Sequence, residues 1–153
     1  MAYVSRDNVS KGKFDEMEAE SKLFNEKNDC SVKAVAVVCG VTYAQARFAL
    51  HQAGRRPGYG ALTHEIHNAV KSLGKVAKRD NSFISVCLDH LRNTKNYVVK
   101  NVTTRQLTMF PELAVGGNWL VYTNGHVIAV KDGKVHCWGA TRALRIKSVY
   151  EVS

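Results

Sequence analysis

The sequence has little that would divide the chain or anchor it in a membrane. Its 153 residues include only two prolines and no low-complexity stretch, so no linker between domains is apparent. The longest apolar run, AVAVVCGV at 34–41, is far shorter than the roughly 20 residues that cross a bilayer. The N-terminal MAYVSRDNVSKGK lacks the apolar core of a secretory signal. We therefore expect one intracellular domain over residues 1–153, with no membrane partner.

Acidic residues are scarce: 13 Asp and Glu stand against 22 Lys and Arg, which gives a net charge of +9. Such a surplus favours acidic partners, nucleic acids among them, because binding releases counterions. However, the basic residues are scattered, and the chain has no arginine-rich run, RNA-binding sheet signature or zinc-finger spacing. We expect weak, non-specific nucleic-acid binding and no dedicated nucleic-acid function.

Because the protein is expected to be intracellular, its four cysteines are predicted to be free thiols and not a disulfide framework. Cys87 and His90, together with His136 and Cys137, make a conceivable zinc set. Adjacent strand residues point to opposite faces, however, so 136 and 137 are poorly placed to bind one ion. His64 and His67 are more simply read as a surface or half-buried pair on a helix. We expect no metal and no cofactor.

Local patterns predict helices in the first half of the chain and strands in the second. The expected helices cover 10–24, 30–39, 42–53 and 61–73, with Thr42 as an N-cap and with Gly54 and Gly74 as stops. A short helix within TTRQLTMFPEL should end at Pro111. Strands are expected at 97–102, 118–123, 126–131, 134–138 and in the C-terminal segment 140–153, whereas 76–96 is ambiguous. Helices followed by a β-meander indicate the α+β class.

The two turns of the predicted meander set its register. Asn124-Gly125 and Asp132-Gly133 are typical of two-residue type I′ turns, which pair His126 with Thr123 and Lys131 with Lys134. Alternation then places His126 on the same face as Trp119, Val121, Ile128 and Val130, with Cys137 diagonally across. This face is the more apolar of the two, and we expect it to pack on the buried helix 30–39.

Cys30 has an unusual position for a structural cysteine. It follows Asn28-Asp29 at the start of CSVKAVAVVC, a helix so apolar that it must be buried nearly all round. Either Asn28 or Asp29 can cap that helix, and the first turn favours a thiolate. Packing on the His126 face would bring thiol and imidazole together, as nucleophilic cysteine catalysis requires. The simpler interpretations are a small buried Cys30 and a His126 bonded to backbone.

Three segments, in the order NDCSVKAVAVVCGVTYAQA, AGRRPGYG and GHVIAVKDGKVHCWG, resemble the papain-like cysteine peptidase fold. The resemblance is to its small phage-encoded branch, which is similar to the double-glycine, bacteriocin-processing peptidases. It spans a motif-bearing core at 25–139 with an unmatched middle, between an N-terminal helical extension at 1–24 and a C-terminal strand at 140–153. It implies a papain-like α+β domain whose buried cysteine-bearing helix packs on the antiparallel meander.

The resemblance also implies roles for individual residues. Cys30 would be the nucleophile and His126 the general base and acid. The usual upstream glutamine is replaced by Phe24, which leaves Asn25 or Asn28 to complete the oxyanion hole with the Cys30 N–H. The Asp or Asn that orients the histidine in the phage relatives is replaced by Cys137, whose thiol is a weak acceptor.

A phage-encoded cysteine hydrolase acting on a peptide, isopeptide or related amide bond is the function that this resemblance implies. Its substrate would be a peptide or protein of the bacterial host, met in the cytoplasm of the infected cell or delivered with the virion. The alternative is a catalytically inactive papain-like protein that binds a host protein or nucleic acid through its basic surface. Cys30 and His126 favour catalysis, whereas Cys137 and the missing glutamine favour binding alone.

Overall fold

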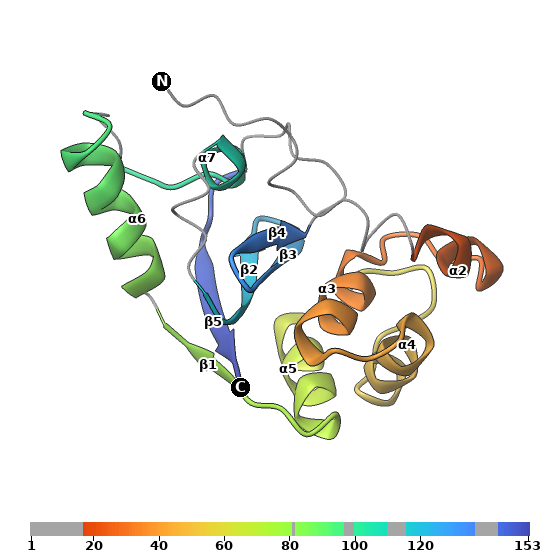
Figure 1. Ribbon diagram of the computed structural model, residues 1–153. Coiled ribbons are helices and arrows are strands. Elements are labelled where there is room, and N and C mark those ends of the chain that lie inside the picture. The colour runs from red at the N-terminus through yellow and green to blue at the C-terminus, as the bar shows by residue number, and fades with distance from the viewer. Residues whose placement is uncertain (1–16, 81, 97–99, 110–115, 137–143) are drawn as a thin grey trace.

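The computed structural model describes residues 17–80, 82–96, 100–109, 116–136 and 144–153. They form a mixture of helices and antiparallel strands, in agreement with the predicted α+β class (Figure 1). In chain order the elements are α2 (Glu18–Leu23), α3 (Cys30–Cys39), α4 (Tyr43–Gln52), α5 (Thr63–Ser72), β1 (Ala77–Arg79), α6 (Ser82–Asn93), α7 (Thr104–Met109), β2 (Asn118–Thr123), β3 (His126–Lys131), β4 (Lys134–His136) and β5 (Ser148–Val152).

The helix limits follow local signals closely. The helix predicted at 30–39 is α3, with the same limits. α4 starts after Thr42, which forms a reciprocal capping box with Gln45, and Gly54 follows its end at a φ of 113°. Of the helix expected at 10–24, the described part is α2, and residues 10–16 lie outside the described ranges. The ambiguous segment 76–96 forms β1 and α6.

The strands form one five-stranded antiparallel sheet in the order β1-β5-β2-β3-β4. The predicted register is confirmed, because Thr123 pairs with His126 and Lys131 with Lys134. Asp132 and Gly133 both have positive φ, as a type I′ turn requires, whereas in the first turn only Gly125 does. β5 lies between β1 and β2, so the C-terminal segment forms an interior strand of the sheet.

Part of the strand expected at 97–102 is absent, since residues 100–102 have no strand structure and 97–99 lie outside the described ranges. Val102 nevertheless accepts a hydrogen bond from the Ile146 N–H, and Thr103 forms an isolated bridge with Arg145. This segment therefore runs beside the chain that leads into β5 without extending the sheet.

Helices cover both faces of the sheet, and this corrects the predicted packing of α3 (Figure 1). The buried residues of α3, α4 and α5 pack on the face of Leu120, Tyr122, Val127 and Ala129. The face of Trp119, Val121, Ile128 and Val130 packs instead on α6 and α7. The prediction was wrong because both faces are buried, so their difference in apolar content says little about which helix covers which.

Candidate active site

Helix α3 presents Cys30 at the edge of the core. Residues Ser31 to Val38 are all buried, whereas Cys30, the first residue of the helix, is half-buried. The predicted cap is wrong: Asp29 occupies the N-cap position but makes no capping hydrogen bond. Its buried carboxylate instead accepts a 2.7 Å hydrogen bond from the Tyr43 hydroxyl, and Asn28 donates to the Gly58 carbonyl at 3.3 Å. The backbone N–H groups of the first turn are thus left without a side-chain cap from Asp29.

Cys30 and His126 lie between two cavities and line both of them, together with Gly60 and Gly125. We call one of them the apolar cavity, because no Asp, Glu, Lys or Arg lines it, and its volume is about 140 Å³. The other, the charged cavity, is lined by acidic and basic side chains and has a volume of about 340 Å³. In addition to the four shared residues, the apolar cavity is lined by Ser31, Ala61, Thr63, Ile66, Tyr122, Thr123 and Val127. The charged cavity is lined by Glu18, Asn28, Asp29 and Lys33.

His126 reaches this cleft because of its place at the start of β3. By alternation it belongs to the α6 side of the sheet, opposite to α3. However, it directly follows the Asn124-Gly125 turn and is half-buried at the end of the strand. The next residue, Val127, belongs to the α3 side, and its backbone N–H forms a hydrogen bond with the Cys30 sulfur. Cysteine and histidine therefore line the same cavities at the end of the sheet, and are not brought together across the predicted face.

The Cys30 thiol is neutral at neutral pH, contrary to the thiolate expected from its helix position. Burial raises the pKa of Cys30, and the neighbouring Asp29 carboxylate raises it further. The backbone N–H groups of Val127 and Ser31 and the Arg55 guanidinium act in the opposite direction but do not outweigh burial. The helix terminus favours a thiolate, but the cost of placing a negative sulfur in a largely apolar environment is greater.

The two candidates for the oxyanion hole occupy different places. Asn28 lines the charged cavity, while Asn25 is not among the described residues that line either cavity. Both have left-handed backbones, with φ of 53° at Asn25 and 54° at Asn28, a conformation that asparagine tolerates well. Of the two, Asn28 is therefore the one placed beside Cys30. Cys137, at the position predicted to orient the histidine, lies outside the described residues.

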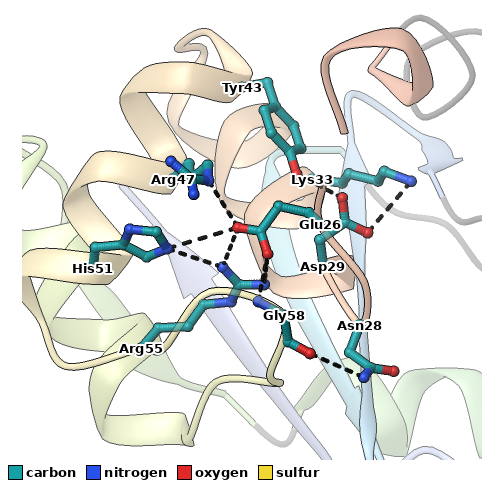
Figure 2. Close-up of polar contacts among 9 residues, drawn as sticks. All are labelled: Glu26, Asn28, Asp29, Lys33, Tyr43, Arg47, His51, Arg55 and Gly58. Carbon is teal, nitrogen blue, oxygen red and sulfur yellow. Dashed lines mark hydrogen bonds and ion pairs between the residues drawn. The ribbon is translucent and has the colours of Figure 1, made fainter. Parts of the chain in front are cut away.

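A buried carboxylate upstream of Cys30 was not predicted from the sequence. The Glu26 side chain is fully buried and accepts hydrogen bonds from Arg55 at 2.9 and 3.2 Å and from Arg47 at 2.7 Å (Figure 2). It also accepts from the Gly58 N–H at 2.6 Å, and His51 Nε2 lies 3.7 Å away. Burial alone would raise the pKa of Glu26, but these donors lower it to about 2.

Glu26 thereby ties together the two segments that frame the cleft. It precedes Asn28 and Cys30, while Arg55 and Gly58 belong to the loop that continues to Gly60 in the wall of both cavities. The Asn28 bond to Gly58 adds a second link between the same segments (Figure 2). No sequence motif indicates that Glu26 is buried. The surrounding segment NEKND is polar and charged, and such a composition is typical of an exposed loop.

The charged cavity has its own ion-pair group. Lys33, the single charged residue of α3, is 6% exposed. Its ammonium lies 2.7 Å from the Glu18 carboxylate and 3.6 Å from that of Asp29. These partners explain how a helix buried nearly all round carries a lysine, since a buried charge is stable only when it is paired.

The described residues contain no group of three or more His, Cys, Asp or Glu side chains that could hold a metal ion. His67 instead shares a hydrogen bond of 3.1 Å with the Tyr122 hydroxyl, and His64 is exposed. Within the described residues, Cys30, Cys39 and Cys87 are not paired in disulfides. None of the described helices has the length and apolar character needed to cross a membrane.

Comparison with known proteins adds no relative: no family model, curated protein or solved structure matches the chain.

Proposed function

We propose that the protein is a papain-like cysteine hydrolase of the phage-encoded type, acting on a peptide, isopeptide or related amide bond of a host peptide or protein. Cys30 is the nucleophile and His126 the general base and acid. One observation carries the proposal: these two residues, 96 positions apart in the sequence, line the same two cavities at the N-terminus of α3. Nucleophile and base must share a substrate site for this chemistry.

The raised pKa of Cys30 favours a general-base mechanism over a standing thiolate–imidazolium pair. His126 accepts the thiol proton while the sulfur attacks the amide carbonyl carbon. The tetrahedral oxyanion is stabilised by the Cys30 backbone N–H, with Asn28 as the second donor. The imidazolium then protonates the leaving amine, the C–N bond breaks and a thioester remains.

Water completes the reaction. His126 removes a proton from a water molecule that attacks the thioester carbonyl, and the C–S bond breaks to release the carboxylic acid. The proton returns to the Cys30 sulfur, so the net change is the hydrolysis of one amide by one water. The Glu26 network supports this cycle by holding the segment of Asn28 and Cys30 against the loop of Gly60.

p-Nitrophenyl acetate tests the proposal without knowledge of the natural substrate. Nitrophenolate release reports acylation, and mass spectrometry identifies the acetylated cysteine. We expect acetyl-Cys30 and turnover in the wild-type protein, loss of both in Cys30→Ala, and a decrease of roughly 10²–10⁴-fold in His126→Ala. Cys39→Ser and His64→Ala are matched controls and should retain the wild-type rate, because Cys39 lies at the other end of α3 and His64 is exposed on α5.

A catalytically inactive binding protein is the second candidate, favoured by the neutral Cys30 thiol. In that case Cys30→Ala and His126→Ala would hydrolyse the ester as slowly as the wild-type protein does. Binding through the basic surface would then be measured with a nucleic-acid duplex at increasing salt. An affinity that hardly changes with salt would exclude the electrostatic attraction expected from a net charge of +9.

A further inference from the structure

Ser31, the residue after Cys30, carries a buried hydroxyl that nothing else in the described ranges satisfies. The residue is 2% exposed, and its Oγ has no hydrogen-bond partner in the described structure. Helical serines commonly donate to a carbonyl of the preceding turn, which Ser31 does not do. Leaving a buried polar group unpaired costs free energy, so such groups are rare in folded proteins and need an explanation.

The other hydroxyls in the apolar cavity are engaged or exposed. Tyr122 shares its hydroxyl with His67 at 3.1 Å, and Thr123 donates to the His126 carbonyl at 3.3 Å. Thr63 is exposed to solvent at the start of α5. Ser31 is therefore the buried side chain in this cavity wall whose hydrogen-bonding capacity is unused within the described part of the molecule.

The size and polarity of the apolar cavity limit what it can take. Its volume is about 140 Å³, and an engineered cavity of roughly 150 Å³ in another protein binds a single benzene. None of its lining residues is Asp, Glu, Lys or Arg, so a charged group would be held there without a permanently charged counter-ion. The charged cavity on the other side of Cys30 differs in both respects.

We propose that Ser31 is a specificity-determining residue, whose hydroxyl forms a hydrogen bond with a short, uncharged polar group of the substrate held in the apolar cavity. A hydroxyl or carboxamide no larger than about one benzene ring fits this description. That the bound group belongs to a substrate rests on the hydrolase proposed above, whereas the recognition of such a group beside Cys30 does not. A site built to pair a polar group rejects an apolar analogue, because its own buried hydroxyl is then left unpaired.

Two small alkylating reagents of similar size test this proposal at Cys30. Iodoacetamide carries a carboxamide that Ser31 can bind, and allyl bromide carries none. The ratio of their rates at Cys30, measured by peptide mass spectrometry, cancels any change in the thiolate fraction. We expect Ser31→Ala to lower the ratio of iodoacetamide to allyl bromide about two- to tenfold, the range of a net hydrogen bond. The ratio at Cys39, on the same helix, should not change.

A ratio at Cys30 that stays at the wild-type value in Ser31→Ala, or that changes equally at Cys39, would overturn the proposal. The melting temperature gives a second criterion, because loss of an unpaired buried hydroxyl should leave it unchanged or raise it. A clear fall would show that the hydroxyl has a structural partner. If Ser31→Ala does not fold, the wild-type protein decides: its ratio at Cys30, relative to glutathione, should exceed that at Cys39.

Alkylation requires no hydrolysis, so the two proposals fail separately. Absence of ester turnover with a lowered ratio in Ser31→Ala would refute the hydrolase and retain Ser31 as a recognition residue. Ester turnover with an unchanged ratio in Ser31→Ala would support the hydrolase and refute the role of Ser31 in recognition.

Discussion

Cys30 shows how one side chain is governed by competing local effects. The N-terminus of a helix favours a thiolate, but burial and the Asp29 carboxylate favour the thiol, and they prevail. A cysteine of this kind is unreactive until a base removes its proton. In the proposed mechanism, the requirement for His126 is therefore greater than it would be with a preformed thiolate–imidazolium pair.

The pH dependence of Cys30 alkylation measures this effect directly. Because its pKa is raised, the thiolate fraction at neutral pH is lower than that of an ordinary cysteine, and the iodoacetamide rate should reach half its maximum above the usual pH of about 8.5. Asp29→Asn removes the carboxylate charge but keeps an acceptor for Tyr43, so it should increase the rate at pH 8 a few-fold. Cys39 in the same sample serves as reference. A half-maximum below pH 8 would show a thiolate and contradict the neutral thiol.

Among the structural elements, the segment between α2 and α3 depends most on a single side chain. Glu26→Gln keeps the size of the side chain but leaves the buried Arg55 without its counter-charge. We expect the free energy of unfolding, measured with urea, to fall by about 3–5 kcal/mol, as is typical when one partner of a buried ion pair is removed.

Glu151→Gln is the matched control, since it makes the same change at an exposed position of β5 and should alter stability by less than about 0.5 kcal/mol. Equal stability of the Glu26 and Glu151 variants would mean that the Glu26 network does not hold the two segments together.

The limits of α3 and α4 and the pairing of β2 with β3 were predictable because each depends on neighbours in sequence. The Thr42 capping box, the left-handed Gly54 and the Asp132-Gly133 turn act over three or four residues. The partners of Glu26 were not predictable. Arg47, Arg55 and Gly58 lie 21, 29 and 32 residues away, and no periodic pattern connects such positions.

The whole molecule should be sensitive to acid through Glu26. Its carboxyl has a pKa of about 2 in the folded protein against 4.5 for the free group, so the folded state binds this proton less tightly. The stabilisation, about 3 kcal/mol, is complete above pH 4.5 and is lost as the pH falls toward 2. About 2 kcal/mol should disappear between pH 6 and pH 3.

Urea unfolding at these two pH values tests this expectation, with Glu26→Gln as the reference that lacks the titrating group. The wild-type protein should lose about 2 kcal/mol more than the variant over this interval. The same loss in both proteins would assign the acid sensitivity to other carboxylates.

The arrangement of layers also belongs to the whole molecule. A sheet covered on both sides has two apolar faces, so alternation along β2 and β3 identified the faces but not the helices that cover them. The position of β5 between β1 and β2 could not be predicted from alternation either. The pairing of a strand at the end of the chain depends on how the whole sheet is packed and buried.

The sequence by itself determined the α+β class, the limits of the cysteine-bearing helix and the register of the meander around His126, since each depends on contacts within a few residues. Only the tertiary structure decided that α3 covers the Val127 side of the sheet, that Cys30 is a half-buried neutral thiol, that Glu26 links the two segments framing the cleft and that Ser31 lines it. These properties arise from segments distant in the chain, and desolvation and pairing act only once those segments are packed together.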